Sequence, residues 1–284
     1  MSNQTSSLSF GRILTLVPPS VAIGIFFLVP FTLILLTSVA HQQQSGDFVF
    51  GFDLAHYQRF FSSVFIERAL FSAALSGTIA VLSLLIAFPF TYALTRFSRR
   101  TRTLWLVYIL AQLSLSEVLI AFSWQILFSR TAGISNIAVW LGLLEKSFAM
   151  APSALAVLVG LVYLALPFAV LLLFPALSRL DRSQIEASFT LGASPLRTFF
   201  TVVLPASRPA LISGGVTVFV LTLGAIIVPQ VLGHPSHWTL SVMITDQAIY
   251  NSNMPFAAAL AVVLLIMSGS VIGLVGWLSR EGNK

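Results

Sequence analysis

Long apolar segments alternate along this chain with short segments that carry most of its charge. Residues 69–95, 147–178 and 247–279 contain no charged side chain. About 20 apolar residues cross the hydrocarbon core of a bilayer, and a lone helix satisfies its own backbone hydrogen bonds there. The pattern therefore predicts an all-α integral membrane protein with six transmembrane helices, at about residues 13–38, 69–95, 104–128, 153–176, 210–232 and 255–278.

The composition supports the same class of protein. Of the 284 residues, 57% are hydrophobic and 8% are charged, whereas roughly 25% of the residues of a soluble domain are charged. The net charge of +6 does not indicate a nucleic-acid partner, because the basic residues lie in short clusters between apolar segments. The absence of cysteine excludes disulfides, thiolate metal sites and a cysteine nucleophile. We expect residues 1–284 to form a single transmembrane domain.

The distribution of lysine and arginine predicts the orientation in the membrane, because cytoplasmic loops carry an excess of both. With both termini in the cytoplasm, eleven basic residues lie inside and four outside. The inside set is Arg12, Arg96, Arg99, Arg100, Arg102, Arg179, Arg182, Arg197, Arg208, Arg280 and Lys284, and the outside set is Arg59, Arg68, Arg130 and Lys146. No clear cleavage site follows the first apolar segment, which we expect to be a retained span rather than a signal peptide.

The cytoplasmic segment 177–209 is long for a loop and has the signals of two short helices. Asp181 can cap the first helix, and Gln184 three residues later can complete a capping box. Gly192 suits the left-handed position that closes a helix. Ser194 offers a second cap, followed by Pro195 in the first turn of the next helix.

The second short helix carries an apolar stripe. Leu196, Phe199, Phe200 and Val203 follow the i, i+3, i+4, i+7 spacing of one helix face, and Pro205 is expected to end the helix. Such a stripe suits docking on a partner protein. It also suits packing against the inner ends of the chain's own spans, and the residues alone leave both interpretations open.

The spacing of residues in this segment resembles the EAA loop of ABC importer permeases. That pattern is E-A-A, three residues, G, nine residues and I-x-L-P. Here Glu186-Ala187-Ser188, Gly192 and Val202-Val203-Leu204-Pro205 keep every spacing, with Ser188 and Val202 as the two replacements. The segments LVYLALPFAVLLLFPALSRLD and VPQVLGHPSHWTLSVMITDQAIYNSNMPFAAALAVVLL are similar to the branch that serves polyamines, opines and aminophosphonates.

The resemblance implies the type I ABC importer permease fold in a bacterial inner membrane, without a catalytic residue or cofactor of its own. It implies two cytosolic ATPase subunits that bind ATP and Mg, a second permease, expected to be a paralogue, and an extracytoplasmic solute-binding protein. No G-x-x-x-x-G-K-[ST] motif is present. The loop would be the coupling helix, with ATPase-coupling residues Glu186, Ala187, Ser188, Gly192, Leu196, Arg197, Leu204 and Pro205.

Glu117 is the candidate for the substrate path, because it falls near the middle of the third predicted span. A charge at that depth costs at least about 2.5 kcal/mol and requires a cavity or a partner. A carboxylate there would suit a cationic solute such as a polyamine. The alternative for Glu117 is a structural role, in which it is protonated or hydrogen-bonded. The alternative solute is an opine, an aminophosphonate or another small anion or zwitterion. Trp124, Asp246 and Tyr250 are further candidates, although Trp124 also fits an interfacial anchor and Asp246 a cap. His234 and His237 have no evident third ligand, so we expect no metal site.

Two other functional classes are less well supported by the residues. A stand-alone secondary transporter would need neither the EAA elbow nor so few ionisable groups within its spans. A membrane-embedded enzyme would need paired carboxylates or a nucleophile with its base at membrane depth, and no such set is present in the sequence.

Overall fold

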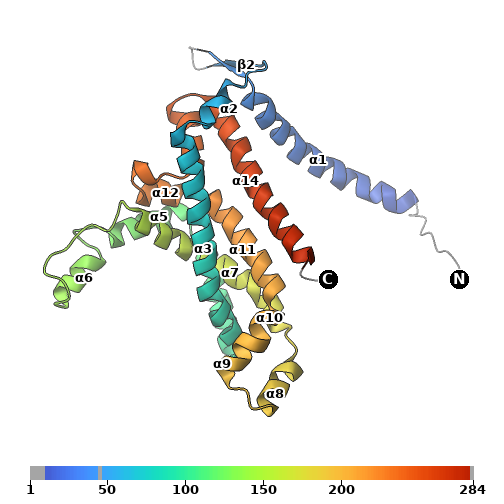
Figure 1. The fold of residues 1–284 in the computed structure, drawn as a ribbon, viewed down its shortest axis with the longest axis vertical. Coiled ribbons are helices and arrows are strands. Elements are labelled where there is room, and N and C mark those ends of the chain that lie inside the picture. Colours follow the sequence, from blue (N-terminus) through green and yellow to red (C-terminus); the bar gives the residue numbers. More distant parts are fainter. Residues whose placement is uncertain (1–9, 44–46, 282–284) are drawn as a thin grey trace. The chain divides into compact units, whose positions relative to one another are not determined.

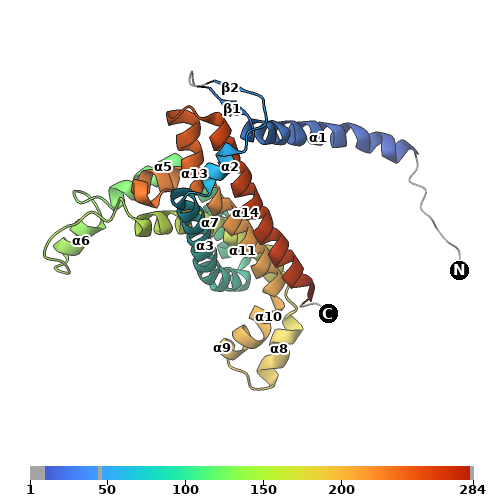
Figure 2. The same ribbon diagram turned by 45° about the horizontal axis from the view of Figure 1, so that its top comes forward.

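The computed structural model describes residues 10–43 and 47–281, with side chains for residues 17–43 and 47–278. The chain divides into two compact units, and each is described by itself. The smaller contains the described residues up to 61 together with 246–263, and the larger contains residues 62–245 with those after 263. Figures 1 and 2 show the ribbon from two directions.

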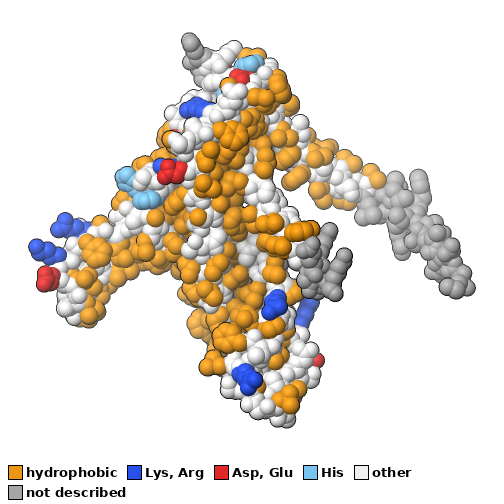
Figure 3. Space-filling model, viewed as in Figure 1, with side chains coloured by type: hydrophobic (Ala, Val, Ile, Leu, Met, Phe, Trp, Pro, Cys, Tyr) orange, Lys and Arg blue, Asp and Glu red, His pale blue; other side chains and the backbone are white. Residues whose placement is uncertain are grey.

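Among the described residues, four helices are long and apolar enough to cross a membrane. They are α1 (Phe10–Ser38), α3 (Ser63–Arg96), α7 (Ala154–Ser178) and α14 (Met254–Glu281). Each contains most of one predicted span, namely the first, second, fourth and sixth. In Figure 3 hydrophobic side chains form large areas of the visible surface, as expected for a protein that faces lipid.

The third predicted span, 104–128, is not a single helix. It is divided into α4 (Arg99–Leu113) and α5 (Glu117–Leu127), which are bent by 93° relative to each other. The break falls at Ser114-Leu115-Ser116, where the Ser114 hydroxyl donates to the Leu110 carbonyl at 3.2 Å. Serine competes with helical backbone bonds in this way, whereas a count of apolar residues does not detect it.

The prediction of residues 210–232 as the fifth single-helix span is also wrong. It contains α11 (Arg208–Leu223) and the short α12 (Ile227–Leu232), separated at Gly224. α12 packs closely on α7, since a Cβ atom on Gly160 would lie 2.7 Å from a methyl carbon of Leu232. A helical run that ends at Ala206 joins α11 at a bend of 70°. If each bent pair counts as one span, the number of spans is six.

The core of the larger unit lies between α3, α7 and α11. Ile79, Leu161, Leu173 and Val218 have no exposed surface there. Its other elements are α6 (Ile134–Trp140), η2 (Pro235–His237), α13 (Leu240–Thr245) and the four short helices of the segment 177–209.

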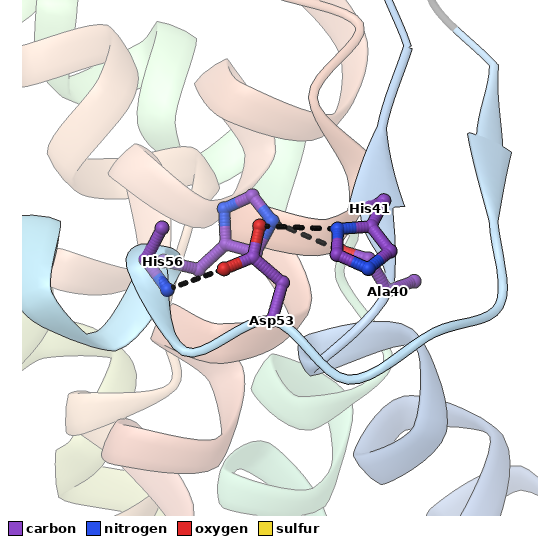
Figure 4. A network of polar contacts seen from close by, with 5 residues as sticks. Ala40, His41, Asp53 and His56 are labelled. Carbon is purple, nitrogen blue, oxygen red and sulfur yellow. Dashed lines mark hydrogen bonds and ion pairs between the residues drawn. The ribbon is translucent and has the colours of Figure 1, made fainter.

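The smaller unit adds a feature that the all-α prediction missed. An antiparallel hairpin, β1 (His41–Gln42) with β2 (Phe48–Val49), precedes α2 (Ala55–Phe60), and η3 (Asp246–Tyr250) leads toward α14. Figure 4 shows the polar contacts beside the hairpin: Asp53 lies 3.4 Å from His41 Nδ1, and the buried His56 is hydrogen-bonded to the Ala40 carbonyl at 3.0 Å. The hydrogen bond from the Ala55 backbone N–H lowers the pKa of Asp53.

Candidate functional site

The segment 177–209 folds as an elbow of two short helical runs, and the first run is α8 (Arg182–Thr190). The Asp181 carboxylate caps it by accepting a hydrogen bond from the Ser183 backbone N–H at 2.9 Å. This bond lowers the pKa of Asp181. The Gln184 side chain makes no hydrogen bond within the part of the chain that the structure describes, so the predicted capping box does not form.

The turn of the elbow has the predicted left-handed glycine. Gly192 has φ = +82°, and its N–H donates to the Phe189 carbonyl at 2.9 Å. The Ala193 N–H donates to the Ser188 carbonyl at 3.0 Å. These two bonds form the Schellman arrangement that satisfies the last carbonyls of a helix, and it favours glycine because a side chain is strained at this φ.

The second run begins as predicted but does not end at Pro205. The Ser194 hydroxyl accepts a hydrogen bond from the Arg197 backbone N–H at 3.3 Å, and Pro195 is the first residue of α9 (Pro195–Thr198). A π-helical turn, η1 (Phe199–Val203), and α10 (Leu204–Ala206) follow. The Leu204 N–H donates to the Phe199 carbonyl five residues back. This wider turn changes the bonding just before Pro205, which lacks an N–H, and the helical run continues to Ala206.

The apolar stripe is divided between two environments. Phe199 packs on α3, with its ring centroid 5.3 Å from that of Phe88 and 5.4 Å from that of Tyr92, and Val203 is fully buried. Leu196 is 73% exposed and Phe200 is 59% exposed. Packing on the chain's own bundle is therefore confirmed for the inner half, while the outer half remains available at the tip of the elbow.

Ser188 joins the two runs of the elbow, a contact that the sequence did not predict. Its hydroxyl lies 2.7 Å from the Ile185 carbonyl, to which it donates, and 2.8 Å from the hydroxyl of Thr198, which is fully buried. The one sequence signal for this contact was Ser188 itself, a polar residue at the position where the motif has its second alanine. The other candidate coupling residues are exposed (Glu186, Ala187, Gly192, Arg197) or half-buried (Leu204, Pro205).

Glu117 is not at mid-helix. It is the first residue of α5, directly after the break, and its Oε1 accepts a hydrogen bond from the Val228 backbone N–H at the start of α12, with 3.4 Å between the two atoms. A carboxylate beside the first N–H groups of a helix is stabilised by their partial positive charge. The break thus gives Glu117 a hydrogen-bond donor that an uninterrupted span would not provide.

Glu117 also lines a cavity of about 330 Å³ between α5, α7 and α11. Gln112 and Tyr163 lie on the same wall, and the Gln112 amide donates to the Tyr163 hydroxyl at 3.3 Å. Neither residue was singled out from the sequence, because a neutral polar side chain in an apolar segment is common. Trp124 lies behind this wall, with its ring centroid 5.5 Å from that of Tyr163 and 5.1 Å from that of Phe128.

The remaining candidates lie in the smaller unit. Asp246 accepts a hydrogen bond from the Asn251 amide at 2.8 Å, which closes the π-helical turn η3, and Tyr250 is exposed. The Asp246 carboxylate thus has a partner within its own turn, and its place in the solute path stays a prediction. Among residues 10–43 and 47–281, no three histidine or acidic side chains are grouped to hold a metal ion.

Comparison with known proteins gives three kinds of match. The family model described as "binding-protein-dependent transport system inner membrane component" matches residues 79–281. The spermidine/putrescine transport system permease protein PotB of Escherichia coli K12 is 27% identical over 261 residues, which cover 92% of this chain and 94% of PotB. The inner membrane ABC transporter permease protein YdcU of the same organism is 30% identical over 230 residues, covering 75% and 72%.

Solved structures match between three quarters and nearly all of this chain. A chain of a bacterial ABC transporter involved in the import of the acidic polysaccharide alginate has a TM-score of 0.74 at 18% identity, with 96% of each chain covered. A chain of the MetNI methionine ABC transporter has a TM-score of 0.57, with 76% of this chain and 94% of that chain covered. At these identities the likeness describes the fold alone.

Proposed function

Because the chain belongs to the family of binding-protein-dependent transport system inner membrane components, we propose that it forms the translocation path for a small polar solute in an ATP-driven importer. The protein is a multi-pass inner-membrane permease subunit of an ABC transporter. Its role is transport, and ATP hydrolysis is assigned to a separate subunit.

The proposed topology has six spans with both termini in the cytoplasm. It counts α4 with α5 as one span, and the helical run from Pro195 through α11 as another. The bias of eleven basic residues to four supports the orientation. The proposed partners are two cytosolic ATPase subunits, a second permease that is a paralogue, and an extracytoplasmic solute-binding protein.

The elbow is the proposed coupling element, and its exposed apolar tip is the observation that carries the proposal. Leu191, Leu196 and Phe200 are 88%, 73% and 59% exposed at the closed end of the elbow. The resemblance of the motif spacing to the EAA loop supports an ATPase contact at this tip. Apolar side chains there gain free energy when a partner protein covers them.

Co-purification of the ATPase tests the coupling role. Phe200→Asp places a charge among the exposed apolar side chains, and we expect the yield of ATPase recovered with the permease to fall about tenfold or more. Thr201→Asp is the matched control, because it adds the same charge at the neighbouring exposed position outside the apolar stripe. Recovery of the ATPase with Phe200→Asp at the yield of the control would contradict the role.

The proposed solute is a cation of the polyamine type. The spermidine/putrescine transport named for the PotB relatives supports it, as does a cavity whose acidic group is Glu117. Uptake of labelled putrescine, spermidine and an opine into cells that express the full transporter tests the proposal. Uptake of the opine alone would contradict the polyamine proposal and indicate an anionic or zwitterionic solute. Uptake that needs no ATP would indicate a secondary transporter.

A further inference from the structure

A second polar cavity, of about 350 Å³, lies where α3 and α7 end beside the first helix of the elbow. Arg96 is the last residue of α3, Ser178 is the last of α7, and Arg182 is the first of α8. All three line the cavity. The site therefore lies at the boundary between two apolar helices and the polar elbow, and it is separate from the Glu117 cavity.

The hydrogen-bond donors of this cavity can be identified one by one. Arg96 donates to the Tyr92 hydroxyl, and its guanidinium carbon lies 4.6 Å from the centroid of the Tyr92 ring. Because the Tyr92 oxygen accepts that bond, its own O–H remains able to donate. The hydroxyls of Thr95 and Ser178 already donate to backbone carbonyls, at 2.7 and 3.0 Å. The donors left to a ligand are therefore the two guanidinium groups and the Tyr92 hydroxyl.

The charge of the cavity favours an anion. Glu186 is the one carboxylate on the wall, against the two guanidinium groups of Arg96 and Arg182. Within the described residues, neither arginine has a carboxylate within the 4.0 Å of an ion pair. The planar fork of a guanidinium matches the oxygens of a phosphate, so a group with one negative phosphate would balance the net positive charge.

The position of the cavity indicates which phosphate could reach it. Under the proposed orientation, the ends of α3 and α7 lie at the cytoplasmic face, where anionic lipids concentrate and basic pockets between helices bind their headgroups. The apolar side chains of Leu177, Ile185 and Phe189 also line the cavity. We propose that this cavity binds the headgroup of an anionic phospholipid of the cytoplasmic leaflet through Arg96, Arg182 and the Tyr92 hydroxyl.

A bound headgroup would connect the membrane to the coupling element. Ile185, Glu186 and Phe189 belong to α8, the first helix of the elbow, whereas Tyr92 and Arg96 belong to α3. A phosphate held between the two helices would fix their separation. The inference rests on the proposed function for its orientation, and it gives the elbow a dependence on the lipid composition of the membrane.

Native mass spectrometry of the full-length permease tests the lipid site. The protein, purified in mild detergent, is incubated with phosphatidylglycerol or phosphatidylcholine vesicles, and the lipid retained by each chain is counted. We expect the wild type to retain one phosphatidylglycerol, and Arg96→Gln and Tyr92→Phe to reduce retention about tenfold or more. Tyr92→Phe keeps the ring that packs on Phe199 and removes the hydroxyl alone, which is both a donor to the ligand and the acceptor for Arg96, so misfolding would not explain its effect.

The control is Arg100→Gln, which removes an arginine from the same end of the bundle but outside the cavity wall. Equal loss of lipid in Arg100→Gln, or full retention in Arg96→Gln, would overturn the proposal. Binding of inorganic phosphate in place of lipid would overturn it as well, because the anion would then come from solution. Co-purification of the ATPase is scored separately, so a failure of the permease assembly is distinguishable from a failure of the lipid site.

Discussion

At the scale of single residues, the position of Glu117 shows how a carboxylate is accommodated in an apolar segment. It follows a break in the helix, accepts a hydrogen bond from the Val228 N–H, and still faces a cavity that Gln112 and Tyr163 share. The hydrogen bond from Val228 lowers the free-energy cost of the Glu117 charge and leaves the carboxylate accessible from the cavity. Glu117 is therefore suited to both a structural contact and a solute contact.

Glu117→Gln separates these two roles, because glutamine keeps the accepting oxygen and removes the charge. We expect uptake of a polyamine to fall by roughly tenfold or more, since a charge-assisted hydrogen bond contributes about 1.5–3 kcal/mol. The measurement is the initial rate of uptake, with ATPase recovery as the check on assembly. Glu145→Gln, at an exposed position outside the cavity wall, is the control. Wild-type uptake by Glu117→Gln would remove the carboxylate from the solute path.

The hydroxyl pair of Ser188 and Thr198 makes a second prediction at this scale. Thr198→Val removes a buried partner, and we expect the free energy of unfolding to decrease by about 1 kcal/mol. Ser188→Ala together with Thr198→Val restores an apolar contact, and it should cost less than the sum of the single changes. Thermal unfolding of the four proteins in detergent measures the cycle. Strict additivity would show that the two hydroxyls do not interact.

At the scale of elements, the elbow is a short structure defined by its ends. The Asp181 cap, the left-handed Gly192 and the Ser194 cap fix where each helical run begins or turns, and Phe199 anchors the second run on α3. Local bonds therefore set the shape of the elbow. A change at the turn should disrupt the elbow without removing the helices that insert into the membrane.

Gly192→Val tests the turn. A β-branched side chain at φ = +82° costs about 1 kcal/mol or more, and we expect loss of ATPase binding with normal membrane insertion. Gly142→Val is a matched control, because Gly142 has φ = +73° and, like Gly192, no atom close to its would-be Cβ, but it lies outside the elbow. Normal ATPase recovery with Gly192→Val, or equal loss with Gly142→Val, would contradict the role of the turn.

At the scale of the whole molecule, orientation is the property on which the proposed assembly depends. The natural chain contains no cysteine, so single-cysteine variants give an unambiguous label. We expect Ser194→Cys in the elbow to be protected from an impermeant thiol reagent in intact cells, and Leu143→Cys to react, because Leu143 is exposed in the segment predicted to lie outside. The reverse pattern would invert the topology.

Prediction from the sequence succeeded where local chemistry decides the structure. The uninterrupted apolar segments predicted the four long helices, and Gly192 and Ser194 were placed correctly by their turn and cap preferences. It failed at 114–116 and 224–226, because a count of apolar residues does not detect the effect of Ser114, Ser116 and Gly224 on a helix, nor the packing of α12 against α5. The contact between Tyr163 and Gln112 joins residues 51 positions apart, and the contact between Thr198 and Ser188 crosses the turn of the elbow, so the periodicity of a single helix predicts neither.

The length of α3 has a mechanical consequence. Near its C-terminal end Phe88 and Tyr92 contact Phe199 of the elbow, and near its N-terminal end Ser72 accepts a hydrogen bond from the Leu240 N–H at 2.7 Å. Its 34 residues make a strut of roughly 50 Å. Pro89 lacks an N–H and so removes one backbone hydrogen bond of α3 close to the elbow. Residues 63–88 are therefore the rigid part of the helix, and bending is concentrated near the end that contacts Phe199. A small movement of Phe199 would thus displace α3 as a rigid body and reach the segment around Leu240 directly. It would not have to pass through a series of separate side-chain rearrangements.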